Sequence, residues 1–325
     1  MIVVTGGAGF IGMNLVLKLI ELGYQDIVIV DNSLKRIMAM ERELHDIPNM
    51  LIYLTVEDSY LWLGFNKYSI DAIFHLGART DTMETDAKLL KRLNVDYSKF
   101  IWNFCTEARI PLIYASSAAV YGDGEDGFSD VDWEWFRPLN LYGQSKYQFD
   151  TWALCSEEEE DMPPHWFGFR FFNVYGNHEQ HKGKMASVIW HFYNQIKETG
   201  EVKLFRSHVD WCEDGEQKRD FVHVDDVVKI MILSYNIRHI MPSGIYNLGT
   251  GRARTYNDLV KAVFKSLDVP VKISYIDTPE EIRESYQYFT QANVDKLMEA
   301  ISGYDFLSLE EGIDLYIKQL EDENR

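Results

Sequence analysis

The stretch TGGAGFIG, residues 5–12, determines the fold that this sequence predicts. It places Gly6, Gly9 and Gly12 in GxxGxxG spacing, directly after the apolar run IVVT (2–5) and at the start of an amphipathic segment. Glycine at these positions permits a tight turn, lets a pyrophosphate approach the backbone and allows close helix–strand packing, while the helix N-terminus offers N–H donors. Because the motif joins the first strand to the first helix, we predict a dinucleotide-binding site here.

Short β-branched runs alternate with amphipathic segments through the first half of the chain. Such alternation, with nearly continuous apolar strands, is typical of a parallel sheet covered by helices on both faces. We therefore predict an α/β fold: a Rossmann-type doubly wound parallel sheet with a smaller C-terminal α/β substrate lobe. The expected strands are residues 2–5, 26–32, 50–55, 71–78, 110–117 and 166–176.

The alternation becomes less regular in the second half of the chain. The segment FVHVDDVVKIMILSY (221–235) is predicted to form one more strand–helix pair that returns to the main sheet. The expected dinucleotide-binding domain is residues 1–172 with a return segment at about 219–245. Residues 173–218 and 246–325 are expected to form the substrate-binding lobe.

The composition excludes several classes of partner. A net charge of -19 argues against nucleic acid or an anionic membrane, because such binding needs clustered Lys and Arg. Three cysteines without zinc-like spacing fit a reducing compartment, and HEQH (178–181) offers two histidines without an evident third ligand, so we expect no metal. We see no signal peptide and no apolar run of about 18–20 residues, and we expect a cytoplasmic protein without a membrane partner.

The residues at the end of the second expected strand bear on the choice of nicotinamide nucleotide. Asp31 would accept hydrogen bonds from a ribose 2′-hydroxyl, which favours NAD. Asn32, Lys35 and Arg36 follow at once, and an asparagine with nearby cations can hold the 2′-phosphate of NADP. From position alone, the two cations could equally belong to an exposed helix start, so both cofactors stay open at this point.

Two further segments belong to the chemical end of the predicted site. Ser117 lies at a strand end, and NLYGQSK (140–146) contains Tyr142 and Lys146 at i and i+4, on one face of a helix. A tyrosine with a pKa near 10 needs a depression of about three units, or about 4 kcal/mol, to act as a base at neutral pH. One ammonium at about 4 Å supplies roughly that in a medium of effective dielectric near 20. The sequence therefore predicts Tyr142 as an acid/base.

Together the glycine turn, the serine and the YxxxK pair resemble the extended short-chain dehydrogenase/reductase superfamily over essentially the whole chain. The resemblance implies that Ser117 polarises the substrate oxygen, that Tyr142 exchanges the proton and that Lys146 also binds the nicotinamide ribose. Within the superfamily, the segments FRFFNVYG and HKGKMASV (169–176 and 181–188), KRDFVHVDDV (218–227), IYNLGTGRARTYNDL (245–259) and YQYFTQA (286–292) are similar to those of the ADP-L-glycero-D-manno-heptose 6-epimerases.

That resemblance implies a reaction and a role for Lys182. The family inverts C6″ of ADP-D-glycero-D-manno-heptose for lipopolysaccharide inner-core synthesis, typically with bound NADP, and often as a pentamer. Inversion by transient oxidation removes a hydride from one face and returns it to the other, so the ketone must take two poses. One fixed Tyr142 serves only one pose well, and Lys182 is implied as the second acid/base, a role that needs its pKa lowered.

The same match implies the remaining site residues. The cofactor-binding residues are Gly6, Gly9, Phe10, Ile11, Gly12, Asp31, Asn32, Lys35, Leu76, Gly77, Ala78, Asn94, Lys146, Val174 and Lys182. The substrate-binding residues are Asn173, Lys184, His191, Phe205, Arg219 and Tyr286. Packing is an equal alternative for Phe205, and Asn94 could equally be a buried helix residue that bonds backbone. His75 is expected to be packed and not catalytic.

The sequence also departs from the family's pattern at several places. Lys184 stands where a small hydroxyl residue is common, and NVYGNHE (173–179) lacks an arginine at His178. Arg79 and Thr80 follow LGA where small residues are usual, and the segment 206–218 is longer than expected. These departures bear on the exact sugar more than on the reaction type.

Two alternatives of function remain. A UDP-hexose 4-epimerase shares the serine, tyrosine and lysine but has no need for Lys182. A nicotinamide-binding sensor without catalysis usually lacks the tyrosine or the lysine, and this chain has both. A 4,6-dehydratase is disfavoured, because Ser117 is followed by two alanines where an Asp-Glu pair would be needed.

Overall fold

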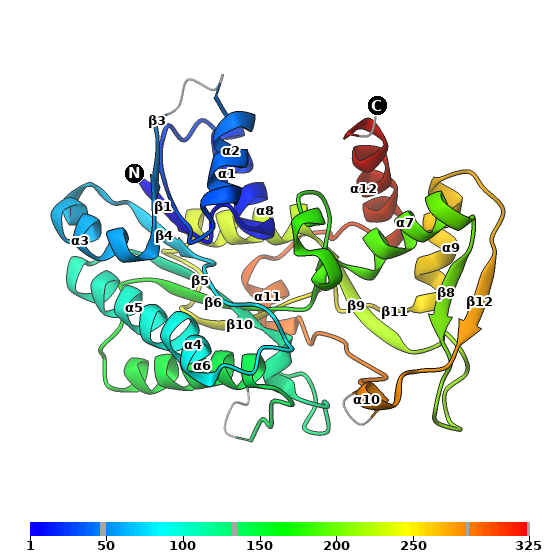
Figure 1. The fold of residues 1–325 in the computed structure, drawn as a ribbon. Helices are drawn as coiled ribbons and strands as arrows, with labels where there is room; N and C mark the ends of the chain where they lie inside the picture. Colours follow the sequence, from blue (N-terminus) through cyan, green and yellow to red (C-terminus); the bar gives the residue numbers. More distant parts are fainter. Residues whose placement is uncertain (46–49, 132–134, 284–285, 324–325) are drawn as a thin grey trace. The chain divides into compact units, whose positions relative to one another are not determined.

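The computed structural model describes residues 1–325 except 46–49, 132–134, 284–285 and 324–325 (Figure 1). The chain forms two compact units, each described by itself below. Unit 1 comprises Met1–Gly122, Asp130–Arg170 and Val228–Tyr246, and unit 2 comprises Asp123–Ser129, Phe171–Val227 and Asn247–Arg325. The domain boundaries expected from the sequence stay a prediction.

Unit 1 is built on a seven-strand parallel sheet, which confirms the predicted Rossmann-type fold. The strand order is β10-β6-β5-β4-β1-β2-β3, so β1 lies where the order reverses and pairs with both β2 and β4. In such sheets ligands bind beyond the carboxyl ends of the strands at this switch point. The strands are β1 Ile2–Thr5, β2 Asp26–Val30, β3 Met50–Leu54, β4 Ala72–His75, β5 Leu112–Ser117, β6 Trp166–Phe171 and β10 Gly244–Leu248.

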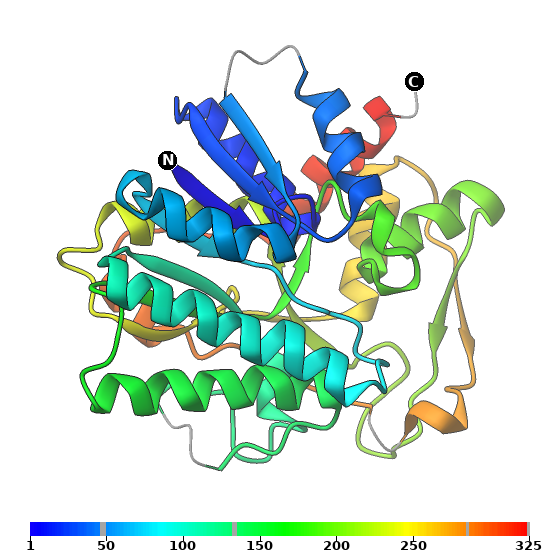
Figure 2. The ribbon, with the colours of Figure 1, turned by 60° about the vertical axis from the view of Figure 1, so that its left-hand side comes forward.

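Helices cover both faces of this sheet, because right-handed crossovers on either side of β1 place them on opposite faces. Helices α1, α2 and α8 lie on one face and α3, α5 and α6 on the other (Figures 1 and 2). Strands β1, β4 and β6 are buried along their whole length, as apolar runs between two helical layers must be. The helices are α1 Phe10–Glu21, α2 Leu34–Glu43, α3 Val56–Asn66, α4 Ala87–Leu90, α5 Tyr97–Ala108, α6 Leu141–Glu158 and α8 Val224–Asn236, with short turns η1 Lys67–Ser69, η2 Lys91–Asp96 and η3 Ala118–Tyr121.

Two predicted strands differ from the observed ones. The run 166–176 divides into β6 and a separate β7, Asn173–Tyr175, because the chain changes sheets at Phe172. The strand predicted to return to the main sheet, now β9 (Lys218–His223), pairs with β7 and with β11 (Ala253–Thr255) in unit 2. Strand β10 completes the main sheet instead. The prediction was wrong because an apolar run identifies a strand but not its partner.

Unit 2 contains the three-stranded sheet β11-β9-β7 and a pair formed by β8 and β12. Its apolar core includes Phe192, Val263 and Ile313, contributed by α7, α9 and α12. The remaining elements are β8 Val202–Phe205, β12 Ile273–Ile276, η4 Gln180–Met185, α7 Val188–Thr199, α9 Tyr256–Ser266, α10 Glu280–Arg283, α11 Asp295–Ala300 and α12 Leu309–Glu323.

One buried carboxylate ties distant parts of unit 2 together. Asp220 of β9 accepts hydrogen bonds from the Thr250 backbone N–H (2.8 Å) and hydroxyl (2.7 Å). It also accepts from the backbone N–H groups of Gly251 (2.9 Å) and Ala292 (3.0 Å). Asp220 thereby fixes the glycine-containing turn after β10 and the segment YQYFTQA against β9.

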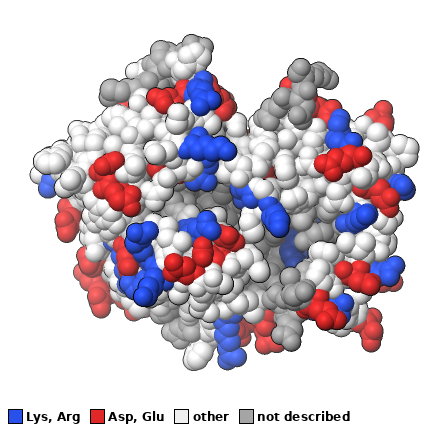
Figure 3. Space-filling model, viewed as in Figure 1, with Lys and Arg blue, Asp and Glu red and all other residues white. Residues whose placement is uncertain are grey.

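Figure 3 shows how charged side chains are distributed on one face of the molecule. Acidic and basic side chains are interspersed on the face shown in Figure 3, without a broad basic field among the described residues on that face. None of the helices in the described part of the chain is both long and apolar enough to span a membrane.

Candidate active site

The glycine turn of unit 1 has the geometry that the motif predicts. Gly6 has φ +66°, and a Cβ there would lie 2.7 Å from the backbone nitrogen of Gly77, at the end of β4. A Cβ on Gly12 would lie 2.1 Å from the Gly6 carbonyl oxygen, so the close helix–strand approach also requires glycine. Gly9 is the N-cap residue of α1 and supplies no capping side chain. The start of α1 therefore suits a pyrophosphate.

Asp31, directly after β2, fits a ribose hydroxyl. Its side chain is buried, and Oδ1 accepts from the Ser33 N–H (2.9 Å) and from Arg36 Nη2 (2.9 Å). Oδ2 is buried and has no hydrogen-bond partner among the described residues. A buried acceptor without a donor is costly unless a ligand supplies one. Of the two neighbouring cations, Arg36 forms an ion pair with Asp31. Lys35, which the sequence predicted to bind the cofactor, is exposed.

A linear chain of hydrogen bonds lies next to the glycine turn. The Gly77 N–H donates to Thr5 Oγ1 (3.1 Å), Thr5 Oγ1 bonds His75 Nδ1 (2.7 Å), and His75 Nε2 bonds Ser98 Oγ (2.9 Å). Burial, with the Lys146 charge nearby, lowers the pKa of His75 to about 3. His75 is therefore a neutral, packed residue, and it holds β1, β4 and α5 together below Leu76, Gly77 and Ala78.

Asn94 lies fully buried in η2, a π-helical turn between α4 and α5. Its Oδ1 accepts from the Arg79 N–H (2.8 Å), and its Nδ2 donates to the Arg79 carbonyl (3.0 Å) and to Ser145 Oγ (2.9 Å). Asn94 thus joins the loop after β4 to α6, next to Lys146. Asn94 is buried and bonds backbone, as one alternative expected, and its role toward the cofactor stays a prediction. Turns of this π type are frequent at functional sites.

The predicted chemical residues meet within unit 1. Ser117 ends β5, Tyr142 and Lys146 lie one turn apart on α6, and the Ser117 side chain lies near enough to the Tyr142 hydroxyl to lower its pKa. Lys146 Nζ donates to the Ala115 carbonyl at 2.9 Å. Both α6 side chains are buried, with exposed fractions of 9% for Tyr142 and 6% for Lys146.

The electrostatics of this set differ from the prediction. Burial raises the pKa of Tyr142, the hydrogen bond from Ser117 lowers it, and the Asp150 carboxylate raises it further. Burial lowers the pKa of Lys146 to about 8, against a raising effect of Asp150. The expected depression of the Tyr142 pKa by Lys146 is not observed: this pKa is raised, burial is the largest cause, and Lys146 is not among the groups that shift it.

Lys182 lies in unit 2, in the 3₁₀ turn η4 that contains HKG. Gly183 has φ +54°, and the Lys182 N–H donates to the Glu179 carbonyl (2.9 Å). The buried Glu179 carboxylate accepts from the Ser187 N–H and hydroxyl, both at 2.6 Å, and so fixes the base of the loop. Burial lowers the pKa of Lys182, with Glu179 acting in the opposite direction. The sequence match did not select Glu179, although it is a lone acid beside the HKG motif.

The predicted substrate residues also lie in unit 2. Asn173 and Lys184 are exposed, Val174 is half-buried, and His191 Nε2 lies 3.4 Å from the Lys184 carbonyl oxygen. Phe205 is half-buried at the end of β8.

Arg219 lies over the ring of Tyr286 in the same unit, with 5.8 Å between the guanidinium and the ring centroid. The long segment 206–218 packs its aromatic residues beside this pair: the rings of His208 and Trp211 lie 5.3 Å and 4.9 Å from that of Tyr288. The segment 206–218 and the motif YQYFTQA therefore form one cluster.

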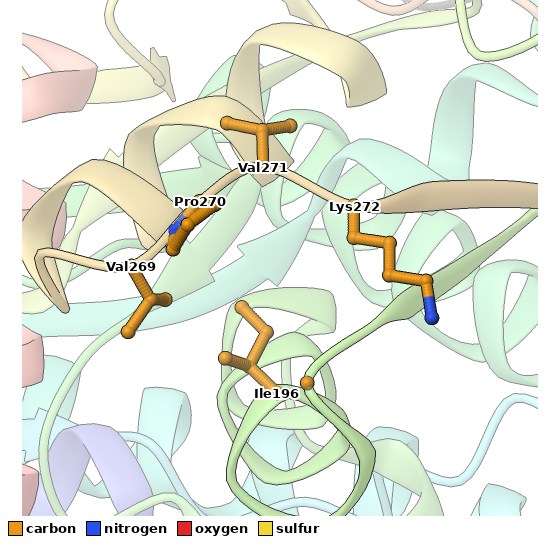
Figure 4. A pocket seen from close by; sticks show the side chains of 6 residues that line it. Ile196, Val269, Pro270, Val271 and Lys272 are labelled. Carbon is orange, nitrogen blue, oxygen red and sulfur yellow. The ribbon is translucent and has the colours of Figure 1, made fainter.

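Unit 2 also has a surface hollow of about 440 Å³, shown in Figure 4. Apart from Lys272, whose amine pairs with Glu201 at 3.0 Å, its lining is apolar, so it offers no acid/base pair. We do not assign it to the candidate site. The lining residues are Ile196, Gly200, Val269, Pro270, Val271 and Lys272.

The comparison with known proteins decides the family. Residues 2–249 match the NAD dependent epimerase/dehydratase family. The chain belongs to this family. A relative from Fusobacterium nucleatum subsp. nucleatum, named ADP-L-glycero-D-manno-heptose-6-epimerase, is 44% identical over 98% of this chain and 97% of its own length. The resemblance stated from the sequence is thereby confirmed.

Solved structures agree with this assignment. The structure of Helicobacter pylori ADP-L-glycero-D-manno-heptose-6-epimerase has a TM-score of 0.81 and 28% identity, covering 98% of this chain and 96% of that one. A structure described as MoeE5 in complex with UDP-glucuronic acid and NAD has a TM-score of 0.78 and 27% identity, covering 99% of each chain. The family and these neighbours support an epimerase with a nicotinamide cofactor.

Two site features were missed by sequence reasoning, Asp150 and Arg170. The Arg170 side chain is fully buried, and its Nε donates to Asp150 Oδ2 at 2.9 Å. Both had a signal in the sequence: Asp150 continues the i, i+4 spacing of Tyr142 and Lys146, and Arg170 is the lone charge in the apolar strand WFGFRF.

Proposed function

We propose that this protein inverts C6″ of ADP-D-glycero-D-manno-heptose to ADP-L-glycero-D-manno-heptose, by transient oxidation to a 6″-ketone, in the supply of the lipopolysaccharide inner core. The observation that carries the proposal is the buried set Ser117, Tyr142 and Lys146, in a chain that is 44% identical over nearly its full length to a relative of that name. The HKG loop supports the choice of a 6-epimerase over a 4-epimerase.

The residues of unit 1 would handle the first proton. The chemistry that a bound nicotinamide would supply is reversible hydride transfer at the sugar carbon. Tyr142, which lies beside Ser117, would exchange the proton of the sugar oxygen. Its raised pKa keeps the phenol protonated, the form that donates to a ketone oxygen on re-reduction. Lys146 holds the strand end through the Ala115 carbonyl and, by the family resemblance, would also bind the nicotinamide ribose.

Lys182 would serve the second pose of the ketone. An amine with an ordinary pKa donates a proton easily but is a poor base at neutral pH. Burial lowers the pKa of Lys182, which brings its neutral form within reach and suits a group that must both donate and accept. Glu179 and Gly183 set the backbone geometry of the short turn that carries Lys182.

We propose NADP as the tightly bound cofactor, with NAD as the alternative. Asp31 Oδ2 is available for a hydroxyl of the adenosine ribose. NAD offers a 2′-hydroxyl there and NADP a 2′-phosphate, so this oxygen by itself favours NAD. Arg36, fixed on Asp31 and 38% exposed, supplies a cation for a 2′-phosphate. The presence of this arginine beside the carboxylate is the support for NADP.

The direct test is NMR analysis of the product after incubation with ADP-D-glycero-D-manno-heptose. We expect the C6″ epimer, and no turnover of UDP-glucose or UDP-galactose. Tyr142→Phe should nearly abolish inversion while fold and cofactor binding survive. Turnover of UDP-hexoses without turnover of ADP-heptose would instead assign the protein to the 4-epimerases.

A further inference from the structure

The buried ion pair between Asp150 and Arg170 calls for an explanation beyond stability. The Asp150 and Arg170 side chains are 1% and 0% exposed, so both charges are withdrawn from water. Apolar residues of similar volume often stabilise a core as well as such a pair does. Arg170 Nη2 is buried without a hydrogen-bond partner among the described residues, which adds to the cost.

The carboxylate holds the strand that carries the candidate catalytic serine. Asp150 Oδ2 accepts a hydrogen bond from Ser116 Oγ at 2.8 Å, and Oδ1 accepts one from the Tyr114 hydroxyl at 3.3 Å. Ser116 directly precedes Ser117 at the end of β5. Asp150 therefore fixes the backbone from which Ser117 projects.

The guanidinium holds the turn on the other side of Ser117. Arg170 Nη1 donates to the Tyr121 hydroxyl at 3.1 Å, and its carbon lies 5.1 Å from the centroids of the Tyr121 and Phe136 rings. Tyr121 ends the short turn η3, which begins directly after Ser117. The two charged groups thus fix the chain before and after this serine.

We propose that Asp150 and Arg170 act as a positioning pair, which aligns Ser117 with Tyr142 and sets the charge balance around the Tyr142–Lys146 couple. This inference rests on the proposed function, in which these residues carry the chemistry. Tyr142, Lys146 and Asp150 follow one another at single-turn spacing on α6, so the carboxylate lies on the reactive face of the helix.

The carboxylate of the pair acts on the titration of both reactive side chains of α6. The Asp150 carboxylate raises the pKa of Tyr142 and, acting against burial, that of Lys146. The other titratable or charged groups that bear on this cluster are neutral His75 from β4, Tyr114 of β5, Tyr121 of η3, Arg170 of β6, and Glu157 further along α6. Removal of the Asp150 carboxylate would leave the Arg170 cation uncompensated. Removal of the Arg170 cation would leave the carboxylate uncompensated, so the two changes should shift the pKa of Tyr142 in opposite directions.

The test is the pH dependence of kcat/KM for ADP-D-glycero-D-manno-heptose in two single variants. Asp150→Asn leaves the arginine cation unpaired, so we expect the midpoint of the rising limb to move about one pH unit lower. Arg170→Met leaves the carboxylate unpaired, so we expect a shift of similar size to higher pH. Asp150→Glu restores the charge and should return the midpoint to that of the wild type. Glu158→Gln, an exposed change on the same helix, should leave it in place.

A loss of activity with unchanged midpoints in Asp150→Asn and Arg170→Met would overturn the electrostatic part of the proposal. If those variants do not fold, Ser116→Ala tests the positioning part, because it keeps both charges. It should lower kcat about tenfold at an unchanged midpoint and an unchanged cofactor affinity. A wild-type kcat in Ser116→Ala would refute positioning through β5.

A second measurement separates this inference from the proposed function. The tyrosinate absorbance of Tyr142, taken as the difference between each protein and its Tyr142→Phe counterpart, follows the phenol without any sugar. If the wild type converts no ADP-heptose, the proposed function fails. Even then, a tyrosinate midpoint that moves in opposite directions in Asp150→Asn and Arg170→Met would support the charge balance. Identical midpoints in the wild type and both variants would reject it.

Discussion

His75 should make this protein selectively sensitive to acid, and its hydrogen bonds show why. The Ser98 hydroxyl donates to the Asn94 carbonyl (2.8 Å), so His75 Nε2 must be the donor toward Ser98 Oγ. His75 Nδ1 is then an acceptor and receives the Thr5 hydroxyl proton. A second proton on the ring would sit between Nδ1 and this hydroxyl and break the chain.

The magnitude follows from the pKa. The folded protein lowers the pKa of His75 from 6.5 to about 3, so the unfolded chain takes up a proton that the folded one excludes. The stabilisation is fully present above pH 6.5 and falls as the pH drops toward 3. The slope is about 1.4 kcal/mol per pH unit, which gives a loss of about 2 kcal/mol between pH 6.5 and pH 5.

The assay is urea unfolding at pH 7, 6 and 5 of the wild type and of His75→Gln, which keeps one donor and one acceptor without titrating. The stability difference between the two proteins should shift by about 2 kcal/mol in favour of the variant between pH 7 and pH 5. His45→Gln, a change of an exposed histidine in the same unit, serves as the control. A difference that stays constant over this range would refute the assigned tautomer and the role of burial.

Four other predictions can be tested separately. Lys182→Met should lower the rate of inversion by at least about 10²-fold with the cofactor still bound. Lys261→Met, at an exposed lysine of unit 2, should not change the rate. Equal rates for Lys182→Met and the wild type in a product assay would remove Lys182 from the mechanism. Arg36→Ala should weaken NADP binding about tenfold and leave NAD unchanged by calorimetry, and equal losses for both would contradict a 2′-phosphate contact. Asp220→Asn places an amide against backbone N–H donors and should cost about 3 kcal/mol in urea unfolding. The resemblance to the heptose epimerases implies a homo-oligomer of five copies, which native mass spectrometry would detect as a single species.

The sequence predicted the parts of the site that depend on local spacing. Gly12 is needed because of contacts within one βα unit, the positive φ of Gly6 belongs to the turn itself, and the Tyr142–Lys146 pair needs only one helical turn. Such features are encoded over a few residues and can be recognised without knowledge of the tertiary structure. The same holds for the strand–helix alternation that predicted the main sheet.

The parts that the sequence did not predict depend on distant partners. Strand β9 was predicted to return to the main sheet, but it pairs with β7 and β11, which lie elsewhere in the chain. The sequence of a strand does not by itself identify these partners. The raised pKa of Tyr142 follows from burial by surrounding side chains, which an i, i+4 pattern does not contain. The π-helical turn at Asn94 likewise depends on bonds to Arg79 and Ser145, neither of which is local to the turn.

The hydrogen bonds of Asp220 have a consequence for synthesis on the ribosome. The Ala292 N–H that completes this carboxylate's set of donors leaves the exit tunnel long after Asp220 itself. Until then a bare carboxylate would have to be buried without its partners, which is unfavourable. Unit 2 should therefore mature only after residue 292 has emerged, while earlier segments can begin to fold during translation, and truncation before residue 292 should yield a nascent chain that relies on chaperones.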